Sequence, residues 1–268
     1  MQRTGLFVIL CSLGFLNAAA DIVTREVSYS DGKTEMTGYL AYDDALEGKR
    51  PGVLVVHEWW GHNDYARSRA KQLAGMGYTA LAVDMYGQGK TADHPKDAGA
   101  MSGAVMANLD QAKARFLAAK DLLESHETSD PERTVAIGYC FGGGVVLHMA
   151  RLGVDLDGVV SFHGSLDTAR PAGKGEVKAR ILVCNGADDA FVSADSIEAF
   201  KKEMDAAGAT YTFKNYSGAV HSFTNPSATE YGRKFELPLQ YNAAADKASW
   251  ADMRAMLEEV FAPAATAQ

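Results

Sequence analysis

One cysteine stands in a setting where its chemistry could be nucleophilic. The segment GYCFGGG, residues 138–144, follows the apolar run Thr134–Gly138 and leads into residues with helical spacing. Gly-x-Cys-x-Gly at a strand-to-helix junction is the pattern of a nucleophile elbow, a turn too tight for bulky neighbours. Such a turn would hold the Cys140 thiol at the positive end of a helix, where a thiolate is stabilised. The backbone N–H of Phe141 would then face a developing oxyanion.

Two other interpretations of the glycine-rich segment stay open. Glycines after a strand can cradle a phosphate, although the G-x-G-x-x-G dinucleotide fingerprint does not fit, because Cys140 occupies its third place. The second alternative is a buried structural cysteine in a glycine-rich turn. Neither alternative accounts for the residues that follow in the chain.

An acid and a base follow Cys140 in the order expected of a nucleophile, an acid and a histidine. Asp188 and Asp189 come after an apolar run, and His221 follows the predicted strand Tyr211–Tyr216. A carboxylate at the carboxyl end of a strand can orient an imidazole, and a histidine in a loop beyond the sheet can reach the nucleophile. We expect Asp189 to be the acid, with its neighbour Asp188 as the alternative.

Short apolar runs predict the sheet that would position these residues. They are rich in Val, Ile and Leu and do not alternate with polar residues, which is typical of parallel strands buried on both faces. The runs are Val53–His57, Thr79–Val83, Thr134–Gly138, Gly158–Phe162 and Ile181–Cys184. Two alternating stretches, Ile22–Ser30 and Glu35–Tyr42, flank Asp31-Gly32 and predict a leading hairpin.

Segments with helical spacing lie between these runs. Asn63, Ser102, Ser193 and Asn242 are the expected N-cap residues, and we expect one long helix from Ser102 through Leu123. The alternation predicts an α/β fold, a doubly wound and mostly parallel sheet flanked by helices, with an N-terminal antiparallel hairpin. We expect a single domain at 21–262 and a C-terminal tail at 263–268. The stretch 224–240 has no clear period and is expected to be a long loop near the site.

The composition is that of a globular protein. Of 268 residues, 47% are hydrophobic and 22% are charged, with a formal net charge of −8. A nucleic-acid binder needs a basic face, which this sequence lacks. Residues 1–20 combine Arg3, an apolar run and small residues before Asp21, which is the order of a secretory signal peptide. We therefore expect an exported protein, periplasmic or secreted, without a membrane span after cleavage.

Loss of such a leader leaves two cysteines, Cys140 and Cys184. An oxidising compartment favours a disulfide between them. However, the strand Gly158–Phe162 should lie between their strands and separate them by roughly 10 Å. A disulfide needs Cα atoms within about 7 Å. We therefore expect two free thiols, with Cys184 buried in the core.

At four places the sequence resembles the dienelactone hydrolase family, which has the α/β-hydrolase fold. The four segments are VVHEWWG at 55–61, GYCFGG at 138–143, GADDAFV at 186–192 and GAVHSF at 218–223. The resemblance extends over residues 21–262. It implies a hydrolase of ester, lactone or thioester bonds that uses an acyl-enzyme and needs no cofactor or metal. In that scheme Cys140 is the nucleophile, His221 the base and Asp189 its orienting acid.

The resemblance also implies roles around the thiol. Glu58 matches the family glutamate that interacts with the resting thiol and helps to hold it until substrate arrives. The N–H of Trp59 would join that of Phe141 in an oxyanion hole. Three further side chains are candidates for the pocket: Trp60, Tyr86 and His163. The tryptophan could instead pack against the edge of the sheet, and His163 could be a packed, hydrogen-bonded histidine.

The chain departs from the family where the substrate is held. Members that act on dienelactone use arginines to bind its carboxylate, and neither 86–101 nor 222–226 contains an arginine here. We therefore expect another small-molecule ester or lactone as substrate. The expected oligomeric state is a monomer or a homodimer. Two alternatives remain open: a non-catalytic ligand-binding protein on the same scaffold, and a thiol-redox protein that uses Cys140.

Overall fold

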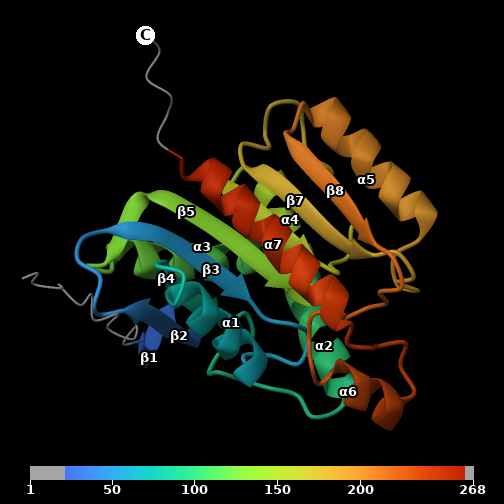
Figure 1. Ribbon diagram of the computed structural model, residues 1–268, viewed down its shortest axis with the longest axis horizontal. Coiled ribbons are helices and arrows are strands. Elements are labelled where there is room, and N and C mark those ends of the chain that lie inside the picture. The colour runs from blue at the N-terminus through green and yellow to red at the C-terminus, as the bar shows by residue number, and fades with distance from the viewer. Residues whose placement is uncertain (1–21, 263–268) are drawn as a thin grey trace, which may run out of the picture.

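Eight strands form one sheet in the order β1-β2-β4-β3-β5-β6-β7-β8 (Figure 1). The computed structural model describes residues 22–262, so the predicted signal peptide and the tail at 263–268 lie outside the described residues. The strands are β1 (Ile22–Ser30), β2 (Glu35–Asp43), β3 (Arg50–Val56), β4 (Thr79–Val83), β5 (Ser129–Tyr139), β6 (Gly158–Phe162), β7 (Arg180–Gly186) and β8 (Tyr211–Tyr216).

The six strands β3 to β8 are parallel to one another, whereas β1 and β2 form an antiparallel hairpin that joins the sheet at β4. Every residue of β3, β4 and β6 is buried, which explains why their sequences are mostly apolar and do not alternate with polar residues. The predicted α/β fold with its N-terminal hairpin is therefore confirmed. The parallel order places the carboxyl ends of β3, β5, β6 and β7 at one edge, where ligands bind in such sheets.

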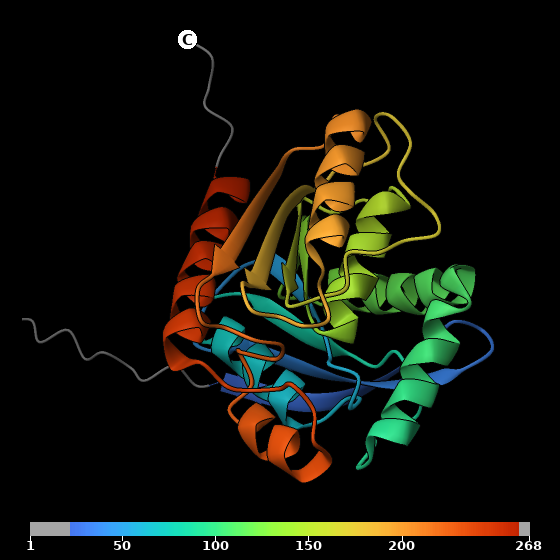
Figure 2. The ribbon, with the colours of Figure 1, turned by 90° about the vertical axis from the view of Figure 1, so that its right-hand side faces the viewer.

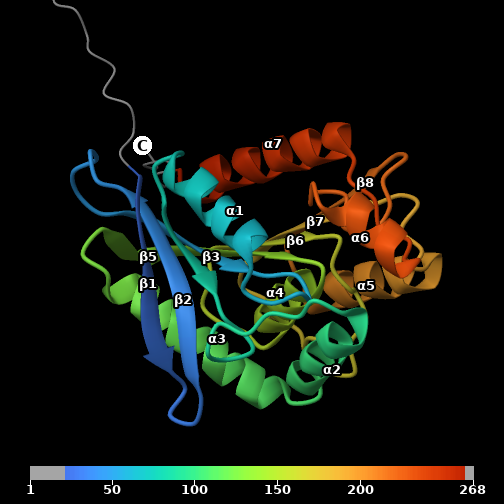
Figure 3. The same cartoon turned by 90° about the horizontal axis from the view of Figure 1, so that it is seen from below.

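Helices cover both faces of the sheet (Figures 2 and 3). The helices are α1 (Asp64–Ala74), α2 (Pro95–Met106), α3 (Leu109–Ser125), α4 (Phe141–Arg151), α5 (Ala194–Ala207), α6 (Ala228–Phe235) and α7 (Ala243–Val260). The apolar faces of α1 and α7 pack on one side, and those of α3, α4 and α5 on the other. None of the helices within 22–262 is long and apolar enough to cross a membrane.

Two sequence predictions about helices are wrong. The single helix expected from Ser102 is two helices, because Pro95 begins α2, which is capped by His94, and Asn108 caps a separate α3. Ser102 lies inside α2, where its hydroxyl donates to the Ala98 carbonyl. The stretch 224–240, expected to be a loop, contains α6. The expected caps Asn63, Ser193 and Asn242 each accept a hydrogen bond from the first turn of their helices.

Candidate active site

Cys140 occupies a strained turn between β5 and α4. Its backbone has φ of 54° and ψ of −116°, a conformation that L residues rarely adopt. Its N–H donates both to the Phe162 carbonyl at 3.0 Å and to Nδ1 of His163 at 3.1 Å. The thiol is partly exposed at the N-terminal end of α4. The neighbouring strand β6 and the residue after it thus hold the backbone of the turn.

Two glycines make this turn sterically feasible. A Cβ on Gly138 would collide with the carbonyl of Gly142, and one on Gly142 would collide with the carbonyl of Val56. The N–H of Gly142 donates to the His57 carbonyl at 3.1 Å, which ties the first turn of α4 to the end of β3. The close approach of β3, β5 and α4 therefore fixes where the Cys140 side chain begins.

The structure brings Asp189 and His221 together beside Cys140. Oδ2 of Asp189 lies 2.8 Å from Nδ1 of His221, and Oδ1 of Asp189 accepts the N–H of Phe191 at 2.9 Å. Asp189 and His221 are both buried, whereas Asp188 is exposed. Because a carboxylate accepts, Nδ1 of His221 carries a proton and Nε2 is the nitrogen left for Cys140. Of the two aspartates, only Asp189 has this contact with the ring.

The charges around His221 favour its protonated form. Burial alone would lower the pKa of the imidazole, but the neighbouring Cys140 sulfur and the hydrogen bonds with Asp189 and Cys140 raise it to about 10. Phe191 packs its ring against the imidazole, with centroids 4.9 Å apart and planes at 72°. His221 is thus held by a carboxylate on one nitrogen and the sulfur on the other.

Two backbone N–H groups near the thiol have no hydrogen-bond partner within residues 22–262: those of Trp59 and Phe141. Phe141 is the first residue of α4, where a helix leaves its N–H groups unpaired. Trp59 follows β3 and lines the same pocket as Cys140. Unpaired N–H groups in such a place suit an oxygen that gains negative charge.

The orientation of the Trp59 N–H is fixed by His57. The Glu58 carbonyl, on the same peptide unit as that N–H, lies 2.5 Å from Nδ1 of His57 and 3.1 Å from the N–H of Gly61. Nε2 of His57 accepts the N–H of Met85 at 3.3 Å. The ring is fully buried, and burial lowers its pKa to about 4, so it is neutral with the proton on Nδ1. Since a trans peptide is planar, pinning the carbonyl directs the N–H the opposite way.

Glu58 is buried, and its contact is with the loop that carries His221. Its Oε2 accepts from the Asn225 amide at 2.5 Å, while Oε1 has no hydrogen-bond partner. Burial raises the pKa of the Glu58 carboxyl, although the hydrogen bond from Asn225 opposes this. No hydrogen bond joins Glu58 to Cys140 within the described part of the chain. The structure therefore does not show the thiol contact implied by the resemblance.

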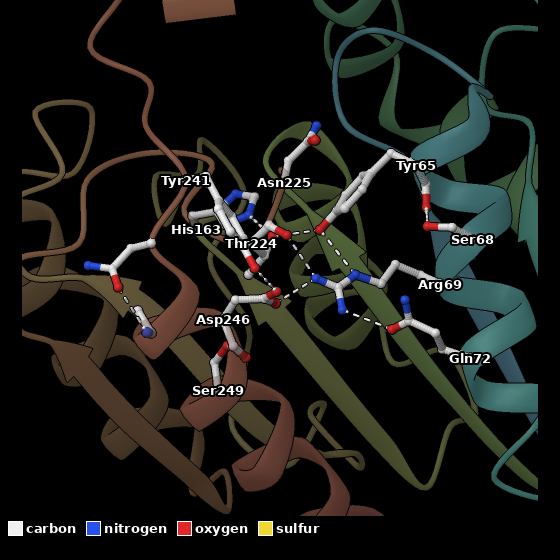
Figure 4. A network of polar contacts seen from close by, with 12 residues as sticks. Tyr65, Ser68, Arg69, Gln72, His163, Thr224, Asn225, Tyr241, Asp246 and Ser249 are labelled. Atoms are coloured by element: carbon white, nitrogen blue, oxygen red, sulfur yellow. Dashed lines mark hydrogen bonds and ion pairs between the residues drawn. The ribbon is translucent and has the colours of Figure 1, made fainter. Parts of the chain in front are cut away.

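A buried polar network holds the loop that carries His221 and reaches the backbone of Cys140; Figure 4 shows its side chains. Nε2 of His163 lies 2.7 Å from Oγ1 of Thr224, which lies 2.6 Å from the hydroxyl of Tyr65. Arg69 of α1 donates to the Thr224 carbonyl at 2.8 Å and pairs with Asp246 of α7 at 2.5 Å. Burial lowers the pKa of His163 well below its usual value, so this ring is neutral and donates from Nε2. The network therefore links two helices to the backbone of Cys140.

A pocket of about 440 Å³ opens in front of Cys140 and His221. Its walls are formed by α2, by the residues after β3 and β7, and by the start of α4. Apolar side chains make up most of the lining: Trp59, Met106, Phe141, Phe191, Val192 and Leu239. Two glycines and one serine of α2, and Ser165, complete it.

The three side chains expected at the pocket, Trp60, Tyr86 and His163, do not line it. Trp60 is buried against Tyr231 and Phe235 in a cluster with α6. The Tyr86 hydroxyl donates to the Trp59 carbonyl at 2.9 Å, and His163 lies behind Cys140. That prediction is wrong because the side chain of Trp59, not that of Trp60, faces the pocket.

Cys140 and Cys184 are free thiols, as predicted. Strand β6 pairs with β5 on one side and with β7 on the other, so it separates them. Cys184 is fully buried, and burial raises the pKa of its thiol to about 12. Within 22–262, no cluster of three or more His, Cys, Asp or Glu residues could hold a metal ion.

A mostly parallel sheet with a strained Gly-x-Cys-x-Gly turn after β5, an aspartate after β7 and a histidine after β8 is the arrangement of an α/β hydrolase. A sequence model of the dienelactone hydrolase family matches residues 36–261. The chain belongs to this family.

Known proteins agree with this assignment. Protein usf of Aquifex pyrophilus is 31% identical over 205 residues, which cover 74% of this chain and 86% of that protein. The solved structure named m3DLH is 37% identical with a TM-score of 0.85, covering 90% of this chain and 99% of the other. A dienelactone hydrolase-like promiscuous phosphotriesterase from metagenomic libraries is 34% identical with a TM-score of 0.83, covering 89% and 98%.

Sequence reasoning missed several residues that shape the site. Asn225 lies in the stretch 222–226, where the family places an arginine, and its amide donates to Glu58 instead. His57 lies inside the segment 55–61 that carries the family resemblance, directly before Glu58, and this position is a usable signal. Arg69 gave no local signal, because its partners Thr224 and Asp246 lie 155 and 177 residues away.

Proposed function

We propose that this protein hydrolyses carboxylic esters, including lactones and thioesters, through Cys140, His221 and Asp189. The observation that carries the proposal is the 2.8 Å contact between Asp189 and His221 beside a cysteine held in a strained turn. The raised pKa of His221, to about 10, supports a base that readily takes the proton of the Cys140 thiol. A thiolate is the reactive form of cysteine.

In the first half of the reaction the Cys140 sulfur attacks the carbonyl carbon. A C–S bond forms, and the carbonyl oxygen becomes an oxyanion that the N–H groups of Trp59 and Phe141 would stabilise. The bond to the leaving oxygen then breaks, and the His221 imidazolium gives its proton to that oxygen. The product of this half is a thioester between Cys140 and the acyl group.

In the second half water replaces the leaving group. Neutral His221 removes a proton from water as its oxygen attacks the thioester carbonyl, and Asp189 stabilises the imidazolium that forms. The C–S bond breaks, which releases the acid and restores the thiolate–imidazolium pair. Every proton transferred passes through Nε2 of His221.

The test is hydrolysis of p-nitrophenyl acetate by the wild type and by Cys140→Ala. We expect kcat to fall by about a thousandfold or more in Cys140→Ala, and intact-mass spectrometry of the wild type to show an acetylated Cys140 during turnover. Cys184→Ala is the matched control, because this thiol is buried behind β6 and should not contribute. Cys140→Ser should hydrolyse poorly, since an alcohol is the weaker nucleophile.

Other outcomes point to the alternative functions. Equal slow turnover by wild type and Cys140→Ala would contradict the proposal and favour a ligand-binding protein. Peroxide-dependent disulfide formation without ester turnover would favour a thiol-redox role.

Export through residues 1–20 is a separate proposal. It is tested by fractionating cells that express the full chain and a chain without that segment.

A further inference from the structure

The pocket in front of Cys140 carries no charged side chain apart from the reacting pair itself. Among residues 22–262, no Lys, Arg, Asp or Glu lines it. Two nearby carboxylates contact other residues: Asp189 binds Nδ1 of His221, and Glu58 accepts from Asn225. The Arg69 guanidinium lies behind the nucleophile, where it binds Asp246 and the Thr224 carbonyl. A substrate carboxylate would therefore enter this pocket without a partner.

Helix α2 supplies a wall with little side-chain bulk. Gly99, Ser102, Gly103 and Met106 line the pocket, and their i, i+3, i+4, i+7 spacing puts them on one face of the helix. Gly103 is exposed, and a Cβ placed on it would meet nothing within 4 Å, so this residue lies where the pocket opens to solvent. The Ser102 hydroxyl donates to the Ala98 carbonyl within the helix. This wall therefore leaves an open and apolar space.

Phe191 marks the entrance of the pocket. Its side chain is 55% exposed, whereas most large apolar side chains in the described part of the chain are buried. It packs against His221, which must protonate the leaving oxygen, so a leaving group would lie next to Phe191. The α2 wall adjoins Trp59 on the oxyanion side, where the acyl chain would extend.

The geometry points to a substrate that is a neutral ester or lactone with an uncharged, apolar acyl group, which lies against the α2 wall. This inference rests on the proposed function and specifies its substrate class. Burying an unpaired carboxylate is costly, whereas burying an apolar chain against Trp59 and Met106 is favourable. Gly103 sets the length of chain that the pocket accepts.

The charge preference can be tested with two matched esters. The p-nitrophenyl ester of pentanoic acid and the mono-p-nitrophenyl ester of glutaric acid differ in that a carboxylate replaces the terminal methyl. We expect kcat/KM to be about a hundredfold or more higher for the neutral ester. Equal values, or a preference for the carboxylate, would overturn the inference even if Cys140 is the nucleophile.

A binding measurement keeps this test separate from catalysis. Valerophenone and 5-oxo-5-phenylpentanoate form the same matched pair without a leaving group, and calorimetry on Cys140→Ala measures their affinities. We expect the neutral ketone to bind at least about tenfold more tightly. Weaker or equal binding of the ketone overturns the inference. If the wild type does not hydrolyse the esters but Cys140→Ala still binds the neutral ketone more tightly than the carboxylate, only the proposed hydrolysis is refuted.

Gly103→Leu tests the role of the α2 wall. The added side chain enters open space and replaces a helical glycine, so the variant should remain folded. We expect kcat/KM for p-nitrophenyl octanoate to fall about tenfold, while that for the acetate changes by less than about threefold. Ala104→Leu, which adds similar bulk on the exposed face of α2 outside the pocket, is the matched control. Equal loss on both esters would show that the wall does not contact the acyl chain.

Discussion

The two sides of Cys140 differ in how their polar groups are paired. Behind it, Arg69, Asp246, Thr224 and His163 satisfy one another within a buried network (Figure 4). In front, the α2 wall presents glycines and apolar side chains around an open volume. A paired buried network admits one arrangement of its members, whereas an apolar surface tolerates many. The network around Arg69 therefore fixes the position of the loop that carries His221. The pocket lined by α2 determines which ligands fit beside Cys140.

The strongest test of this contrast is Arg69→Met. The substitution leaves the Asp246 carboxylate and the Thr224 carbonyl without their cation in a buried site, so we expect the unfolding free energy to fall by about 3–5 kcal/mol. Urea denaturation measures this loss. We also expect kcat to fall more than KM rises, because the loop carrying His221 loses an anchor.

Arg67→Met on the same helix is the matched control. Arg67 pairs with Glu26 at 2.9 Å, but both side chains are partly exposed, so we expect a cost of only about 0–1 kcal/mol. Similar losses in the two variants would mean that the network behind Cys140 is no more important than a surface ion pair.

A smaller effect is expected from His57→Phe, which tests the side of the site that directs the Trp59 N–H. Phenylalanine keeps the contacts with Tyr86 and Phe141 but cannot donate to the Glu58 carbonyl or accept from Met85. We expect a loss of about 1–3 kcal/mol in stability and of about tenfold or more in kcat with KM little changed.

His62→Phe is the matched control for His57→Phe, because it distinguishes an effect on the position of the Trp59 N–H from an effect on stability alone. His62 is also buried, and its Nε2 donates to the Ala82 carbonyl at 3.1 Å. It makes no hydrogen bond to the peptide between Glu58 and Trp59. This variant should lose stability to a similar extent while retaining kcat. If both variants lose kcat equally, His57 acts only through the stability of the fold.

The smallest effect is expected at Glu58, whose Oε1 lacks a partner. Burial raises the pKa of its carboxyl in the folded protein, so folding favours the protonated form. This contribution is complete below the ordinary glutamate pKa and is lost as the pH rises to the raised value. Relative to Glu58→Gln, the wild type should therefore become less stable as the pH rises from 4 to 8. Urea denaturation across this range measures the difference, and parallel curves would contradict the assignment.

The same contrast explains what could be predicted from sequence. The bounds of β4 and β6 agree with the sequence prediction at every residue, because burial on both faces favours a mostly apolar, non-alternating run. The Cys140 turn was predicted because its glycines are local requirements of the backbone. The network of Arg69 could not be predicted, since its members come from α1, α7 and a distant loop.

The errors have local causes. The break between α2 and α3 was missed because apolar spacing continues across Asn108, and that residue nevertheless caps a new helix. The short helix α6 lies between two prolines and has only eight residues, too few to show a period. The pocket prediction failed at Trp60, because sequence does not tell which of two adjacent tryptophans packs against α6.

The position of β6 has a consequence for damage to the enzyme. If an oxidant converts the Cys140 thiol to a sulfenic acid, condensation with a second thiol is the usual way back. Cys184 lies on the far side of β6 and is buried, so within residues 22–262 no thiol can serve this purpose. Repair of an oxidised Cys140 therefore depends on a reductant small enough to enter the pocket, and without one the lesion proceeds to irreversible oxyacids.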